Sequence, residues 1–136
     1  MRIKDAVSAR DFLNRHGNGS AVSPAAPSLE TNIELRPTTD EAKLNKLETA
    51  WLEVLRNRGY MWIGIQNITL KLGDDCRYIP DFWALDGGKL LAFETKGFME
   101  DDALVKIKTA ARQFPWLIIV LVKRERGVWS EVEVRP

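Results

Sequence analysis

The chain has 136 residues, of which 45% are hydrophobic and 29% are charged, with a formal net charge of +1. This length suits one domain with its own core and is too short for two, so we expect one globular unit with a tail. The small net charge does not by itself indicate nucleic-acid binding, although a local basic patch remains compatible with it. A single cysteine, Cys76, and a single histidine, His16, exclude an internal disulfide, a multi-cysteine zinc site and histidine-based catalysis. Any catalysis must therefore use carboxylates and lysines.

The sequence contains no apolar run of the length needed to span a bilayer. Its first residues, MRIKDAVSARDFLNRHG, lack the apolar stretch and small-residue cleavage site of a secretory signal. We therefore expect a cytoplasmic protein, located in the host cell cytoplasm if a phage encodes it.

Residues 1–37 are expected to form an N-terminal arm and a linker. Residues 1–16 have the apolar spacing of a short helix, whose stability alone would be marginal. The stretch GNGSAVSPAAPSLETN that follows has the composition of a linker. Two interpretations stay open: an irregular segment packed on its own domain, or an arm that contacts DNA or forms a dimer.

Residues 38–136 are expected to form the domain, which begins with a helix that ends near Gly59. Thr38 and Glu41 have the spacing of a capping box, and glycine is common just after a helix. Three β segments follow, in YMWIGIQNITLKLG, CRYIPDFWALDGG and KLLAFETKG. The last two should form a hairpin through the turn DGG.

A second helix is predicted in MEDDALVKIKTAARQF, which has apolar residues at helical spacing and acidic residues at its start. The apolar run WLIIVLVKR is typical of a strand buried on both faces, and VWSEVEV of an edge strand. The predicted order is α-β-β-β-α-β-β, an α/β fold in which a mixed sheet has a helix on each side.

Two carboxylates interrupt the second and third β segments. Side chains in a strand alternate between faces, so Glu94 and Lys96 point the same way, and Asp81 shares its face with Trp83. The predicted hairpin can bring Asp81 beside Glu94 if the two faces match, but the sequence leaves the register open. Adjacent carboxylates repel unless a divalent cation lies between them, and oxygen ligands of this kind suit Mg²⁺ or Mn²⁺.

Helix periodicity selects a third carboxylate. At about 100° per residue, the apolar residues around Leu44 fall in an arc of about 160°, and Glu48 lies inside that arc. Glu53 lies on the opposite, solvated side. An acidic residue on an apolar helix face is costly unless it is compensated, so we choose Glu48 over Glu53.

These residues predict a site for one or two divalent ions. Asp81, Glu94 and the carbonyl of Thr95 would ligate the first ion, and Glu48 would hold a second ion or an ordered water. Lys96 would orient the attacking water and offset charge on a phosphate oxygen. Metal-bound water has a lowered pKa, and two ions can stabilise both the attacking and the leaving oxygen. The pattern therefore indicates phosphodiester hydrolysis without histidine.

The joint pattern resembles the PD-(D/E)XK nuclease superfamily and, within it, the Holliday-junction-resolving endonuclease I family of bacteriophages. KLETAWLEVLRNRG is similar to the family's opening helix, YIPDF to its Pro-Asp-Phe strand, and FETKGFMEDD to its Glu-Thr-Lys-Gly segment. The resemblance implies a restriction-endonuclease-like mixed sheet flanked by helices. It also implies that Glu48, Asp81, Glu94 and Lys96 occupy the catalytic positions.

By that resemblance we expect a Mg²⁺-dependent endonuclease acting on branched or Holliday-junction DNA, with a homodimer as one option and no small-molecule cofactor. Other readings stay open. One is a nicking or end-processing nuclease without junction preference. Others are a non-catalytic DNA-binding or assembly module of the same fold, and an RNA-directed or protein-interaction role in a larger complex.

Three further residues are candidates for DNA contact. Lys108 and Arg112 are four residues apart on the flank of the second helix, where a solvated flank is an equal alternative. Gln66 could reach the site from the first β segment, although a hydrogen-bonded strand amide is the simpler interpretation. Lys106 is expected to point away into solvent. The five tryptophans are expected mostly in the core.

Overall fold

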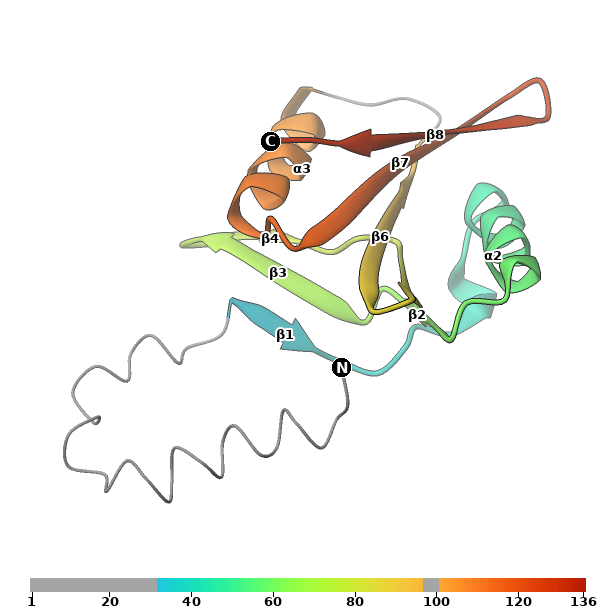
Figure 1. Cartoon of the computed structure of the whole chain (residues 1–136), viewed down its shortest axis with the longest axis horizontal. Helices are drawn as coiled ribbons and strands as arrows, with labels where there is room; N and C mark the ends of the chain where they lie inside the picture. Colours follow the sequence, from blue (N-terminus) through green and yellow to red (C-terminus); the bar gives the residue numbers. More distant parts are fainter. Residues whose placement is uncertain (1–31, 97–100) are drawn as a thin grey trace, which may run out of the picture. The chain divides into compact units, whose positions relative to one another are not determined.

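The computed structural model describes residues 32–96 and 101–136 (Figure 1). The predicted arm helix and most of the linker, together with residues 97–100 of the FETKGFMEDD segment, lie outside the described residues. Within the described ranges no helix is both long enough and apolar enough to cross a membrane.

The described chain is a mixed α/β protein, as the sequence predicts. In chain order the elements are β1 (Ile33–Leu35), the 3-10 helix η2 (Glu41–Lys43), α2 (Lys46–Arg58), β2 (Trp62–Ile65), β3 (Ile68–Gly73), β4 (Cys76–Tyr78), β5 (Phe82–Asp86), β6 (Lys89–Thr95), α3 (Asp101–Gln113), β7 (Leu117–Glu125) and β8 (Val128–Val134). β1 lies within the segment predicted as arm and linker, and it pairs with β3.

The strands form two sheets. The larger has the order β2-β5-β6-β7-β8, in which β6 and β7 are parallel and the other neighbours are antiparallel. The smaller is antiparallel, with the order β1-β3-β4. A parallel pair needs a crossover connection, and α3 lies in the connection between β6 and β7.

This arrangement differs from the predicted order because two of the predicted β segments each divide into two strands of different sheets. Between β2 and β3, Gln66 has a left-handed backbone with φ of 49°. Between β4 and β5 stands the buried Pro80, which has no N–H to donate to a ladder. The two corners are joined, since the N–H of Gln66 donates to the carbonyl of Asp81 over 3.1 Å.

The first helix begins later than predicted. Leu44 has an extended backbone, which separates η2 from α2. The capping box is formed by Asn45 and Glu48 rather than by Thr38 and Glu41. A helix starts where its first N–H groups find side-chain acceptors, and the Asn45 side chain provides that acceptor here.

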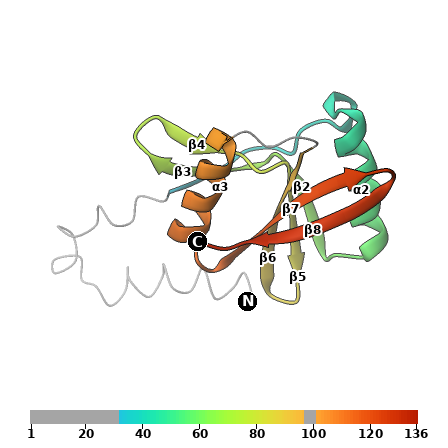
Figure 2. The same cartoon turned by 90° about the horizontal axis from the view of Figure 1, so that it is seen from above.

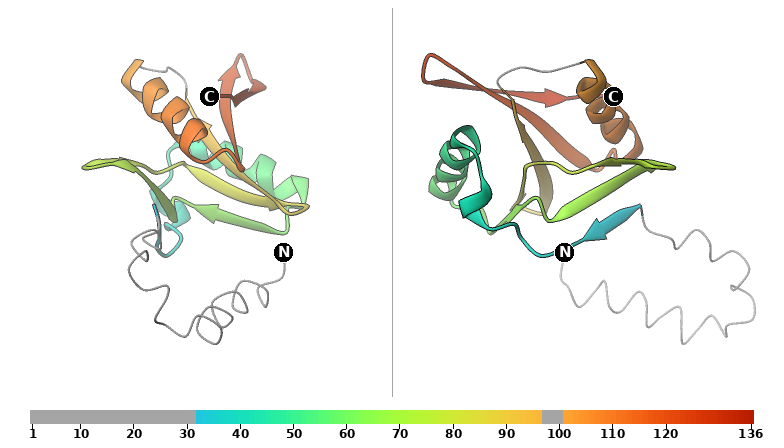
Figure 3. Two further views of the ribbon diagram at one scale, coloured as in Figure 1. Left: turned by 60° about the vertical axis from the view of Figure 1, so that its left-hand side comes forward. Right: turned by 180° about the vertical axis from the view of Figure 1, so that it is seen from behind.

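Apolar clusters cover both faces of the five-stranded sheet. On one face, α2 packs through Trp51 and Leu55 against Phe82 and Phe93. On the other face, α3 and the three-stranded sheet pack around Trp83. Figure 1 shows α2 and α3 on opposite sides of β6, and α3 lies beside β3 in both views of Figure 3. The predicted helix on each side of the sheet is therefore confirmed.

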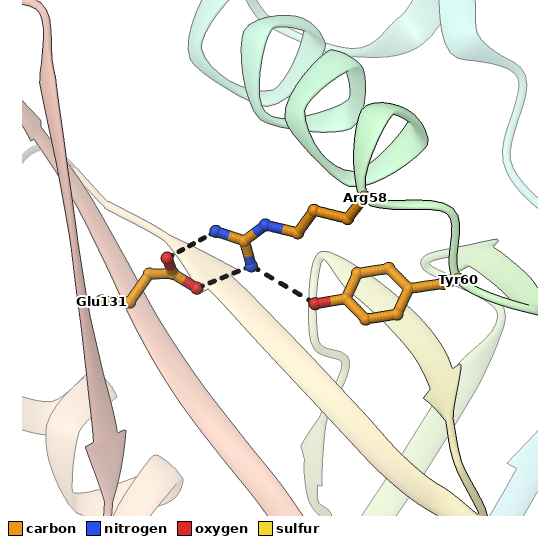
Figure 4. A network of polar contacts seen from close by, with 3 residues as sticks. All are labelled: Arg58, Tyr60 and Glu131. Atoms are coloured by element: carbon orange, nitrogen blue, oxygen red, sulfur yellow. Dashed lines mark hydrogen bonds and ion pairs between the residues drawn. The ribbon is translucent and has the colours of Figure 1, made fainter.

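Arg58, the last residue of α2, joins this helix to the edge strand β8. Its guanidinium donates hydrogen bonds of 2.9 and 2.6 Å to the two carboxylate oxygens of Glu131, and one of 3.3 Å to the hydroxyl of Tyr60 (Figure 4). The same guanidinium lies 5.0 Å from the ring centroid of Trp51. Figure 2 shows β7 and β8 running from the α3 side of the sheet towards α2. The bidentate pair thus holds the end of α2 against the middle of β8.

The tryptophans only partly follow the expectation of burial in the core. Trp51 and Trp83 are fully buried, whereas the exposed fractions of Trp62 and Trp116 are 38% and 54%. Trp116 packs edge-on against Phe114. Its position beside a helix end, rather than in the middle of a strand, explains why period-two alternation fails to place it.

Gly64 provides a test of the packing in β2. A Cβ at Gly64 would lie 2.6 and 2.7 Å from two ring atoms of Trp62 and still closer to the side-chain oxygen of Asn67. Gly64→Ala should therefore lower the free energy of unfolding by about 1–3 kcal/mol, measured by urea denaturation. Gly73→Ala is the control, because nothing lies within 4 Å of a Cβ there. Equal stability of the two variants would contradict the packing of Trp62 over Gly64.

Candidate active site

The hairpin of β5 and β6 places the two predicted carboxylates next to each other. Its register runs from Asp86 opposite Lys89 to Phe82 opposite Phe93. Gly87 and Gly88 have φ of 56° and 84°, the left-handed backbone that a two-residue hairpin turn requires. The predicted hairpin is thus confirmed, and one further step of the same register sets Asp81 opposite Glu94.

Asp81 is half-buried at the corner before β5 and is held by the end of β6. Its Oδ2 accepts hydrogen bonds of 2.9 Å from both the backbone N–H and the hydroxyl of Thr95. Its Oδ1 accepts no hydrogen bond from any residue that the structure describes. One oxygen is therefore fixed and the other is left without a protein donor.

Glu94 is buried, with 8% of its side chain exposed. Its Oε1 accepts a 3.0 Å hydrogen bond from the hydroxyl of Tyr78, and its Oε2 lies 3.2 Å from Nζ of Lys96. Tyr78 is a residue that sequence reasoning missed. Its only signal was its place just before the Pro-Asp corner, where it reads as an ordinary apolar strand residue.

The electrostatics of the pair follow from burial. Burial and the neighbouring charge of Asp81 raise the pKa of Glu94 to about 7, against the lowering effect of Lys96 and Tyr78. Burial also raises the pKa of Asp81, and its two hydrogen bonds from Thr95 oppose that rise. Burial lowers the pKa of Lys96, but the charges of Glu94, Asp81 and Glu48 outweigh it and raise the pKa overall. The raised pKa values show that the site disfavours two ionised carboxylates, even with Lys96 beside them.

Glu48 lies in the first turn of α2, the helix that packs on the face of the sheet formed by Phe82 and Phe93. It is the third residue of the helix, and its Oε1 accepts a 3.0 Å hydrogen bond from the backbone N–H of Asn45 in the capping box. Its charge contributes to the raised pKa of Asp81. The structure thus places Glu48 in electrostatic range of Asp81 and also gives it a role at the start of the helix.

The donor set fits a hydrated divalent cation better than a cage made wholly of protein ligands. Among the described residues, no three histidine, cysteine, aspartate or glutamate side chains are placed to hold a metal ion together. Mg²⁺ commonly uses only one or two carboxylates and keeps several waters. The half-buried Asp81 and the buried Glu94, which repel each other, offer such a pair, and Thr95, which follows Glu94 in the chain, hydrogen-bonds to Asp81.

The candidate DNA-binding residues stand apart from this pair. Lys108 and Arg112 are exposed on α3 and form no hydrogen bond or ion pair with any described residue. Gln66 lies in the corner after β2 rather than within a strand, and its backbone N–H contacts the backbone of Asp81. No contact in the described structure connects the side chains of these three residues to Asp81 or Glu94.

Comparison with models of known protein families finds no match to this chain. A search of curated proteins likewise finds no matching sequence.

The buried Glu94 predicts a pH dependence of stability in the metal-free protein. Because the folded-state pKa of about 7 lies above the ordinary 4.5, folding favours the neutral acid. This contribution is complete below about pH 4.5 and is lost as the pH rises through about 7, with an upper limit of about 3 kcal/mol. With EDTA present, wild type should lose stability relative to Glu94→Gln over that range, measured by urea denaturation at each pH.

The control for this experiment is Glu53→Gln, which changes an exposed glutamate of α2 and should follow wild type at every pH. A constant difference between wild type and Glu94→Gln from pH 4.5 to 8 would contradict the raised pKa of Glu94.

The capping box predicts that two substitutions of Glu48 differ in their effect on stability. Glutamine keeps an oxygen acceptor for the N–H of Asn45, so Glu48→Gln should change the free energy of unfolding by less than about 0.5 kcal/mol. Glu48→Ala removes the acceptor and should cost about 1 kcal/mol. Both are measured by urea denaturation beside Glu53→Ala. Equal loss in both Glu48 variants would show that its charge, rather than the cap, stabilises the fold.

Proposed function

We propose that the protein is a divalent-metal-dependent endonuclease that hydrolyses phosphodiester bonds in DNA. The observation that carries the proposal is the pair formed by the half-buried Asp81 and the buried Glu94, with Lys96 at 3.2 Å from the Glu94 carboxylate. Burying two neighbouring carboxylates with one lysine is unfavourable for the fold alone. Perturbed groups of this kind are characteristic of functional sites.

In the proposed reaction, Asp81 and Glu94 would hold Mg²⁺ or Mn²⁺, with the Thr95 carbonyl as a further oxygen ligand. The cation would neutralise charge on the phosphate and make bound water more acidic. Asp81 suits this role because Thr95 fixes one of its oxygens and leaves the other available. Tyr78 orients the Glu94 carboxylate through its Oε1.

Lys96 has a separate task in this mechanism. Its ammonium lies beside Glu94, and 38% of its side chain is exposed, so it can face both the carboxylates and an incoming phosphate. A protonated lysine there orients the attacking water and offsets charge that develops on the phosphate oxygens. The raised pKa of Lys96 keeps it protonated at neutral pH. Glu48 adds negative charge near Asp81 and would hold an ordered water or a second ion.

We assign the protein to the PD-(D/E)XK nuclease superfamily as part of this proposal. Support comes from the sequence resemblance, from the mixed sheet, and from the position of Asp81 before β5 with Glu94 and Lys96 at the end of β6. Branched or Holliday-junction DNA as substrate, and homodimer formation, follow from the resemblance alone. A role in phage DNA recombination is the biological setting that this substrate suggests.

The test is cleavage of a labelled four-way junction, a linear duplex and a single strand of shared sequence, each with Mg²⁺, Mn²⁺ or EDTA. Wild type should cleave DNA only with a divalent ion. Asp81→Asn and Lys96→Met should each reduce the single-turnover rate by about 10²-fold or more, whereas Glu53→Gln should leave it unchanged. Glu48→Gln should also slow cleavage if its charge, beyond its cap, serves the site.

The pattern of substrates decides between the readings. Cleavage confined to the junction supports a resolvase, and equal cleavage of all three supports a nuclease without junction preference. DNA binding with no cleavage in either metal would overturn the enzyme and favour a non-catalytic module. A matched RNA duplex in the same assay separates deoxyribonuclease from ribonuclease activity.

A further inference from the structure

A cavity of about 270 Å³ lies beside Glu94, between β4 and the first turns of α3. Glu94, Tyr78 and Arg77 line it from the strands, and Lys106 and Ile107 line it from the helix. Asp81 and Lys96 are not among its lining residues. The cavity therefore adjoins the proposed reaction centre across Glu94 without being that centre.

Lys106 is the cation at this cavity whose charge is least compensated. Its Nζ donates a 3.3 Å hydrogen bond to the backbone carbonyl of Arg77, which draws the lysine from α3 across to β4. It forms no ion pair with a carboxylate within residues 32–96 and 101–136. An ammonium has three N–H donors, so two remain for a ligand. Lys106 is exposed, as helix periodicity predicts, and it also lines the cavity.

Arg77 is a second cation at the rim of the cavity, where it forms an ion pair with Glu34. Its guanidinium lies 3.0 and 2.9 Å from the two carboxylate oxygens of Glu34 in β1. The same carboxylate is 3.0 Å from Nζ of Lys71. Two cations share one carboxylate here. Of the charged residues that line the cavity, Arg77 and Lys106 are positive and Glu94 is the acid.

The size and lining of the cavity limit its ligand. Its volume is slightly below the range of about 300–1,000 Å³ that is typical of small-molecule sites. Ile107 and Ala103 provide an apolar wall opposite the polar strand residues. Both oxygens of Glu94 are already engaged, by Tyr78 and by Lys96, which limits the repulsion of an anion. A single phosphate with its sugar fits these features.

We propose that this cavity binds a phosphate of the substrate strand next to the one that is cleaved, with Lys106 as its principal ligand and Arg77 at its rim. This inference rests on the proposed function, because it takes the substrate to be a nucleic acid. Contacts to backbone phosphates position a strand without reading its sequence. Lys106 would thereby set the register of the strand relative to Asp81 and Glu94.

The test measures binding of the full chain to a labelled DNA duplex in EDTA over a series of salt concentrations. Lys106→Gln keeps a donor for the Arg77 carbonyl but removes the charge. It should weaken binding several-fold at low salt and reduce the slope of log K against log salt by about one. Lys106→Arg should retain the wild-type slope. Lys89→Gln, at the turn of the hairpin, is the control.

Two results would overturn the proposal: an unchanged slope in Lys106→Gln, or an equal change in Lys89→Gln, which would indicate a general effect of lost positive charge. Absence of DNA binding by wild type would also overturn it. Cleavage with Mg²⁺, measured separately, keeps the two proposals distinct. If wild type cleaves DNA and Lys106→Gln binds DNA with an unchanged salt slope, only the proposed phosphate site is ruled out. If the slope changes but wild type cleaves no DNA, the nuclease is ruled out and the phosphate site stands.

Discussion

The burial of two carboxylates on neighbouring strands is the constraint on which the rest of this structure depends. Removing Asp81 and Glu94 from water without compensation would oppose folding. The chain compensates with two hydrogen bonds from Thr95 to Asp81 and with Tyr78 and Lys96 on the two oxygens of Glu94. These contacts only partly offset burial, because the pKa values of both acids remain raised. The remaining imbalance is of the kind that a bound cation relieves.

The two sheet corners explain how these groups meet. Tyr78 ends a strand of the three-stranded sheet, whereas Glu94 belongs to the five-stranded sheet. The hydrogen bond between them therefore joins the two sheets where the chain passes from one to the other. The hydrogen bond from the N–H of Gln66 to the Asp81 carbonyl joins the corner between β2 and β3 to the corner between β4 and β5. The position of Asp81 thus depends on both sheets, and so does any chemistry at the carboxylate pair.

Local patterns predicted the parts of the fold that depend on local physics. The turn DGG predicted the hairpin, and strand alternation predicted that Glu94 and Lys96 share a face. Only the register of the hairpin was missing to place Asp81 opposite Glu94. The corner at Gln66 escaped prediction because a non-glycine residue adopts a left-handed backbone there. The hydrogen bonds of Tyr78 to Glu94 and of Lys106 to the Arg77 carbonyl were not predicted. Both join segments that are distant in the sequence, and the periodicity within one element carries no information about such contacts.

Glu48 shows how a structural and a chemical requirement can fall on one residue. Periodicity selected it as an acid on an apolar helix face, and the structure supplies a simpler local reason, the capping box with Asn45. The cap uses Oε1, however, and Oε2 accepts no hydrogen bond from the described residues. A capping glutamate has a fixed backbone position and a restrained side chain, so its second oxygen is presented with little further loss of conformational entropy. The cap therefore leaves the second oxygen of Glu48 available for the role proposed near Asp81.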